Sequence, residues 1–124
     1  KQSDAFLKDL WQTIQSSPDY KNNTTLIVTT DHGRGSHASD WQHHSSRRAL
    51  LELNLGADVF PNGIVGSEHI WLAAIGPTIK GNGLIKTDNE LKQAQIAATV
   101  LKALGQNPNT INPNMAPAIN EILK

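Results

Sequence analysis

Residues 24–30, with the sequence TTLIVTT, constrain the fold of this chain more than any other segment. They are mostly β-branched or apolar and do not alternate with polar residues, which is the pattern of a strand buried on both faces. The tripeptide Asp31-His32-Gly33 follows immediately. Since a strand covered on both faces needs helices above and below it, the segment predicts an α/β protein with polar side chains where a buried strand ends.

The first helix is expected over residues 3–16. Apolar residues recur there at positions i, i+3, i+4 and i+7, which are Leu7, Leu10, Trp11 and Ile14. Pro18 forces the helix to end before it. One apolar stripe of this kind is suited to covering one face of a sheet.

The second half of the chain predicts another strand and another helix. Residues 70–75 (IWLAAI), closed by Gly76-Pro77, have the composition of a second interior strand. Thr87 and Glu90 fit a capping box, with Thr87 as N-cap, and the apolar periodicity that follows ends at Gly105. A final short helix is expected within residues 116–123.

These elements predict an α/β fold containing part of a mostly parallel sheet flanked by helices. Two or three strands are too few to complete such a sheet, because interior strands need neighbours on each side. The polar first residues also resemble a cut inside a longer chain. We therefore expect the 124 residues to be incomplete as a fold, and the rest of a parent chain to be their first partner.

The composition excludes several classes of function. Eleven Lys and Arg residues balance eleven Asp and Glu residues, so no basic stripe neutralises a nucleic-acid backbone, and we expect no nucleic-acid partner. No apolar run is long enough to cross a bilayer, so we expect no transmembrane segment in this chain. No Cys occurs, so a bound metal would have to be held by His and carboxylate side chains.

Asp31 and His32 are the first candidate metal ligands. A carboxylate oxygen and an imidazole nitrogen together suit zinc or manganese. Adjacent residues in a continuing strand point to opposite faces, so both can face one ion only if the chain turns at once, which Gly33 permits. The alternative is an Asx-type turn that leaves His32 as an ordinary surface histidine.

A third ligand is expected from the glycine- and serine-rich loop that follows. His44 is close enough in sequence for this loop to fold back to the same strand end, and Trp41 is suited to anchoring it. His37 and His43 have the same side chain, and spacing alone does not decide among the three.

Four blocks of this sequence, in order, resemble the C-terminal part of the alkaline phosphatase superfamily, in particular its type I phosphodiesterase and phosphatase-like members. The blocks are residues 24–35 (TTLIVTTDHGRG), Trp41-x-x-His44, residues 70–77 (IWLAAIGP) and residues 95–105 (QIAATVLKALG). The resemblance implies that residues 1–124 are the C-terminal fragment of a single larger alkaline-phosphatase-like catalytic domain.

The resemblance also implies a metal-dependent hydrolase of phosphate esters, either a phosphatase or a phosphodiesterase. Asp31 and His32 would hold one of two divalent metal ions and His44 the other, with zinc the usual metal and manganese an alternative. A Ser or Thr nucleophile, expected upstream of this chain, would form a phosphoenzyme that water then hydrolyses. We therefore expect this chain to be inactive alone. His44 is followed by Ser45 where relatives tend to have glycine, which leaves His43 open as the ligand.

Two alternatives remain at this point. The first is a sulfatase or a phosphomutase of the same superfamily, which shares the Asp-His-Gly turn. The second is a non-catalytic binding or structural module that keeps the fold while its histidines bind nothing. The resemblance also favours an exported protein, periplasmic or secreted.

Overall fold

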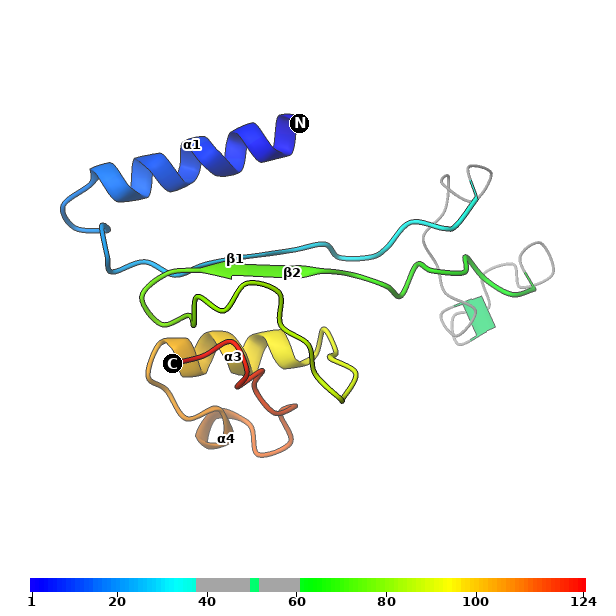
Figure 1. Cartoon of the computed structure of the whole chain (residues 1–124). Coiled ribbons are helices and arrows are strands. Elements are labelled where there is room, and N and C mark those ends of the chain that lie inside the picture. Colours follow the sequence, from blue (N-terminus) through cyan, green and yellow to red (C-terminus); the bar gives the residue numbers. More distant parts are fainter. Residues whose placement is uncertain (38–49, 52–60) are drawn as a thin grey trace. The chain divides into compact units, whose positions relative to one another are not determined.

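A computed structural model of the chain describes residues 1–37, 50–51 and 61–124 (Figure 1). Five elements have defined bounds in these residues: the strands β1 (Leu26–Thr29) and β2 (Leu72–Ile75) and the helices α1 (Gln2–Ser16), α3 (Gln95–Ala103) and α4 (Pro108–Ile111). None of the helices in the described part of the chain combines the length and the apolar character needed to span a membrane, as the sequence predicts.

The chain divides into two compact units. The first unit is made of Lys1–Ile27 together with Ala74–Lys124, and the second is Val28–Ala73. Both strands run through the boundary, since β1 and β2 each have two residues in each unit.

The two strands form an antiparallel pair, and the structure has no further named strand in the residues it describes. Hydrogen bonds join segments that run in opposite directions: Thr25 to Thr78, Thr29 to Trp71, Gly33 to Ser67 and Ser36 to Val65. The predicted mostly parallel sheet flanked by helices, taken as part of an alkaline-phosphatase-like α/β fold, is therefore wrong. The prediction failed because apolar composition identifies a strand but does not give the direction of its partner, and an antiparallel pair needs no crossover connection.

The strands are also less buried than their composition predicts. In β1 three residues are half-buried and the last is exposed, and in β2 half-buried and exposed residues alternate. Ile75 is 49% exposed, although it was expected to lie inside a sheet. A strand with one neighbour and one covered face leaves every second side chain in solvent.

The first helix agrees closely with the sequence prediction. α1 extends over Gln2–Ser16, and its cap residue Ser17 has extended backbone dihedrals. Pro18 comes next, and its missing N–H and fixed φ prevent the helix from continuing.

The start of α3 differs from the prediction and its end agrees with it. The helix begins at Gln95, far beyond Thr87, whose hydroxyl donates to the carbonyl of Asn89 and so forms no capping box. At the other end Gly105 has a φ of 73°, and its N–H donates to the carbonyl of Lys102. The next amide, that of Gln106, donates to Leu101, which completes a Schellman motif.

The core of the first unit lies between α3 and the C-terminal segment. Thr99 is completely buried, and its hydroxyl donates to the Gln95 carbonyl at 2.7 Å and accepts from the Ile119 amide at 2.9 Å. The buried apolar residues of this unit are Ile79, Ala98, Ile119, Ile122 and Leu123. The helix expected within residues 116–123 does not form; Leu123 instead makes an isolated antiparallel bridge with Ile79.

Candidate metal centre

Asp31 and His32 lie in a bend that begins immediately after Thr30, at the end of the segment containing β1. The backbone N–H of His32 donates to Oδ1 of Asp31 at 2.9 Å. This hydrogen bond is made with the next residue, whereas in an Asx-type turn the side chain accepts from the amide two residues on. The observed bond is therefore not the Asx-type turn that was the alternative to a metal site, and the positions of the remaining donor atoms decide what the bend can do.

The two candidate ligands converge in space. Nε2 of His32 lies 3.6 Å from Oδ2 of Asp31, so the oxygen not used by the His32 amide faces the imidazole. The side chain of Asp31 is 87% exposed and that of His32 is 43% exposed. Both side chains therefore face one point, and this point is open to solvent.

The separation of these two donors fits a shared metal ion. Zinc binds imidazole nitrogen and carboxylate oxygen at about 2.0–2.2 Å, and a tetrahedral angle between them then places the two donors about 3.4 Å apart. The observed separation of 3.6 Å is close to that value. A neutral nitrogen and a carboxylate oxygen are also a donor set that zinc and manganese accept. Asp31 and His32 are thus chemically and sterically able to hold one divalent ion together.

The carbonyl oxygen of the neighbouring Gly33 favours one tautomer of the His32 imidazole. Nδ1 of His32 lies 2.8 Å from the carbonyl oxygen of Gly33. A carbonyl only accepts hydrogen bonds, so Nδ1 must carry the hydrogen, and the neutral ring then has its lone pair on Nε2. Metal-binding histidines commonly donate their other ring N–H to a backbone carbonyl in this way, which fixes both the tautomer and the ring orientation.

The turn at residues 66–69, which is distant in the sequence, contacts the bend through its backbone. The amide of Gly33 donates to the carbonyl of Ser67 at 2.6 Å, and within the turn the amide of His69 donates to Gly66 at 3.2 Å. An added Cβ on Gly33 would lie 2.3 Å from the Gly66 oxygen and 2.4 Å from the His69 oxygen. Gly33 is therefore required because another backbone approaches closely, and not because of a positive φ, which it does not have.

The role of Ser67 was not identified from the sequence. It acts through its backbone carbonyl, so its residue type gives no signal, although the adjacent Gly66 (φ 93°) marks a turn at this place. His69, in the same turn, has an exposed side chain.

The third predicted ligand, His44, lies outside the described residues, as does its competitor His43. His37 is described and exposed, and it does not complete a metal site. In residues 1–37, 50–51 and 61–124 no three His, Asp or Glu side chains form a group that could hold an ion. Of the three predicted ligands, the described part of the chain thus contains Asp31 and His32, and the predicted second ion depends on His44.

Comparison with protein-family models, with curated proteins and with solved structures gave no match.

Proposed function

We propose that this chain contributes the Asp31–His32 pair to a metal-dependent hydrolase of phosphate esters. The observation that carries the proposal is the convergence of Nε2 of His32 and Oδ2 of Asp31 at 3.6 Å, with the His32 tautomer directed by the Gly33 carbonyl. The four sequence blocks that resemble the alkaline phosphatase superfamily add the expected reaction. In that reaction water adds across the ester P–O bond and releases an alcohol and phosphate.

Each described residue has a defined part in this proposal. Asp31 supplies a negative charge and one oxygen donor, and His32 supplies a neutral nitrogen donor at a fixed orientation. Gly33 and the Ser67 carbonyl hold the bend at the end of the strand segment. A bound divalent ion would supply positive charge that stabilises the charge developing on a phosphoryl group.

The exposure of the pair supports a functional site over a structural ion pair. A surface Asp–His contact in water stabilises a fold by only about 0–1 kcal/mol. With the Asp31 side chain 87% exposed, the contact contributes little to stability, and a substrate can reach it. A buried structural site would need these side chains to be covered.

The first experiment measures zinc binding by calorimetry on the chain and on two variants. We expect Asp31→Asn and His32→Gln each to weaken zinc binding by about a hundredfold, because each removes one donor. Asp31→Asn keeps a side-chain oxygen that accepts from the His32 amide, so the bend itself should be retained. Asp88→Asn and His69→Gln, both on exposed residues, serve as matched controls and should bind zinc like the unaltered chain.

The second experiment measures hydrolysis in the protein that contains this chain. Release of nitrophenol from p-nitrophenyl phosphate should require a divalent metal, stop with a chelator and be lost in both ligand variants. Hydrolysis of a nitrophenyl sulfate in preference to the phosphate would point to a sulfatase, and isomerisation of a sugar phosphate without net hydrolysis would point to a mutase. A zinc affinity that is unchanged in both ligand variants would contradict the proposed site. If neither hydrolysis nor phosphoryl transfer is observed, the alternative of a non-catalytic binding module would be favoured.

A further inference from the structure

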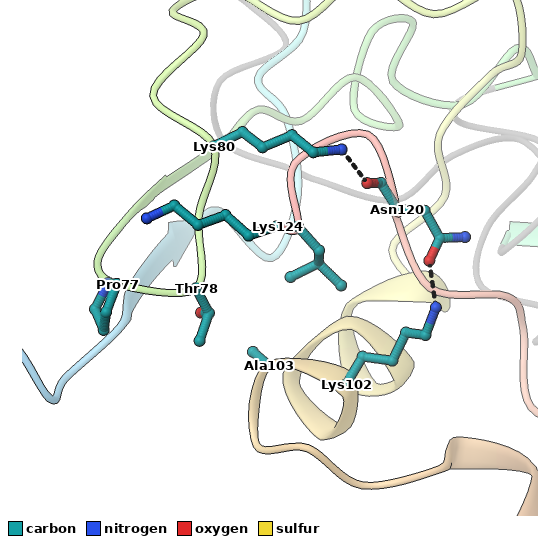
Figure 2. Close-up of a pocket in the computed structure, with 8 residues that line it drawn as sticks. Pro77, Thr78, Lys80, Lys102, Ala103, Asn120 and Lys124 are labelled. Carbon is teal, nitrogen blue, oxygen red and sulfur yellow. Dashed lines mark hydrogen bonds between the residues drawn. The ribbon is translucent and has the colours of Figure 1, made fainter.

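A cavity of about 500 Å³ lies in the first unit and is lined by three lysines (Figure 2). Lys80 follows β2, Lys102 is in the last turn of α3, and Lys124 is in the C-terminal segment. Thr78 and Asn120 are the other polar residues of the lining. Segments that are distant in the sequence therefore bring three lysine residues to one cavity.

Backbone pairing explains how the chain builds this cavity. The amide of Lys80 donates to the Ile122 carbonyl at 2.8 Å, and the amide of Lys124 donates to the Thr78 carbonyl at 2.9 Å. The Ile79–Leu123 bridge lies between these two bonds, and both of its side chains are buried. The positions of Lys80 and Lys124 are thus defined by paired backbone next to the core.

Asn120 is the acceptor for two of the three lysines. Nζ of Lys80 donates to the backbone oxygen of Asn120 at 3.1 Å, and Nζ of Lys102 donates to its side-chain Oδ1 at 2.7 Å. Figure 2 shows these two amino groups turned toward Asn120, while the amino group of Lys124 lies on the side of Pro77. Each ammonium has three N–H donors, so one bond to a neutral oxygen leaves donors for a ligand.

No carboxylate side chain balances the charge of the lysines in this cavity. No Asp or Glu lines it, and among the described residues none of the three lysines forms an ion pair. Neutral carbonyl oxygens orient Lys80 and Lys102 but do not cancel their charge. Like charges held near one another repel, and an anion placed between them lowers the electrostatic free energy.

We propose that this cavity binds the phosphate group of a small organic phosphate. The tetrahedral oxyanion would accept hydrogen bonds from the ammonium groups of Lys80 and Lys102. The organic part would contact the apolar wall formed by Pro77, Ala103 and Leu123. The volume of about 500 Å³ lies within the range of small-molecule sites, so there is room for more than an inorganic ion.

The proposed anion site does not depend on the proposed metal centre. Every residue that lines the cavity belongs to the first unit, whereas Asp31 and His32 belong to the second. The test is therefore made in the Asp31→Asn/His32→Gln chain as well as in the unaltered chain. Equal binding in both chains is expected, and binding that is lost with the metal ligands would overturn this proposal.

The experiment is a titration of the whole ¹⁵N-labelled chain with phenyl phosphate, followed by NMR in a chelator. We expect saturable shifts at the amides of Thr78, Lys80 and Lys102, weaker binding of inorganic phosphate and no binding of phenol. Equal affinity for inorganic phosphate would overturn the assignment of an organic ligand. Equal affinity for phenol would show that the lysines take no part.

Charge variants make the test specific. The double variant Lys80→Gln/Lys102→Gln should weaken phenyl phosphate binding by about tenfold or more, because it removes two charge-assisted donors. The matched double variant Lys8→Gln/Lys21→Gln removes the same charge from exposed residues of the same unit that do not line the cavity. It should change the affinity by less than about twofold, since exposed charges at a distance are screened. If both double variants lose the same affinity for phenyl phosphate, the effect comes from net charge alone, and this result would overturn the proposed site.

Asn120→Asp is the variant least open to a folding artefact. It keeps the shape of the side chain and its acceptor for Lys102, so far-UV circular dichroism should be unchanged. The new carboxylate would act as an internal counter-ion for Lys102 and Lys80, and we expect it to abolish phenyl phosphate binding. Unchanged binding in this variant would overturn the proposal.

Discussion

The amide of Gly33 donates a hydrogen bond of 2.6 Å to the carbonyl of Ser67, and this contact supports the bend that carries both candidate metal ligands. It brings the two backbones so close that no side chain fits on Gly33. The orientation of His32 depends on the same residue, because the carbonyl of Gly33 faces Nδ1 of the imidazole at 2.8 Å.

Gly33→Ala should therefore destabilise the chain and weaken zinc binding by the candidate ligands Asp31 and His32. The added methyl would overlap the oxygens of Gly66 and His69, and overpacking of this kind costs about 1–3 kcal/mol. If the bend shifts to relieve the overlap, zinc affinity should fall by about tenfold, as for other losses of ligand orientation. Urea unfolding measures the change in stability, and calorimetric titration measures the change in zinc affinity. A variant with unchanged stability and unchanged zinc affinity would show that the backbone oxygens of Gly66 and His69 do not crowd Gly33.

Gly105→Ala should destabilise the chain for a different reason. There is open space around Gly105, but its φ of 73° lies in the left-handed region, where a non-glycine residue costs about 1–2 kcal/mol. The cost should appear in urea unfolding without any change in zinc affinity.

Gly81→Ala is the control for both glycine variants. An added Cβ on Gly81 meets nothing within 4 Å, and its φ lies outside the left-handed region. The substitution should leave stability unchanged or raise it by about 0.4–1 kcal/mol, because alanine restricts the unfolded chain more than glycine does. A loss comparable to that in Gly33→Ala would mean that alanine itself, and not crowding, is responsible.

Zinc should stabilise the folded chain if Asp31 and His32 bind it in the folded state. At a free zinc concentration a hundred times the dissociation constant, the expected gain is about 2.7 kcal/mol, and it should disappear when a chelator is added. Thermal unfolding followed by circular dichroism measures the gain. At the same zinc concentration the Asp31→Asn chain, with its hundredfold weaker binding, should keep only about 0.4 kcal/mol of the gain, and an equal gain in that variant would place zinc elsewhere.

Thr99→Val should be strongly destabilising although it preserves the shape of the side chain. It leaves the buried Ile119 amide without its acceptor, which costs about 1–3 kcal/mol. Thr13→Val removes a similar hydroxyl, which donates to Asp9 on the exposed surface of α1, and should change stability by less than about 0.5 kcal/mol. Equal free energies of unfolding for the two variants would contradict the role of Thr99 as the acceptor for the Ile119 amide.

Features set by neighbouring residues could be predicted from the sequence. Pro18 ends α1 through its own ring, and Gly105 ends α3 through its own φ. Asp31 and His32 could be paired because they are adjacent and precede a glycine. Each of these outcomes requires only a few consecutive residues.

Features that depend on distant segments could not be predicted. The direction of β2 relative to β1 depends on how the chain returns, and the support that Ser67 gives to Gly33 uses only backbone atoms. Thr87 fits a capping box, yet its hydroxyl bonds Asn89 and the helix begins later at Gln95. A local motif indicates one available conformation, and contacts elsewhere decide whether the chain adopts it.

The double hydrogen bond of Thr99 also determines how the first unit opens. Because the Ile119 amide proton points to a hydroxyl that is itself inside the core, water reaches it only when α3 and the C-terminal segment separate. Deuterium uptake at this amide would thus follow the cooperative opening of the helix and the segment together, while amides along α1, where no residue is buried, would exchange through local fraying.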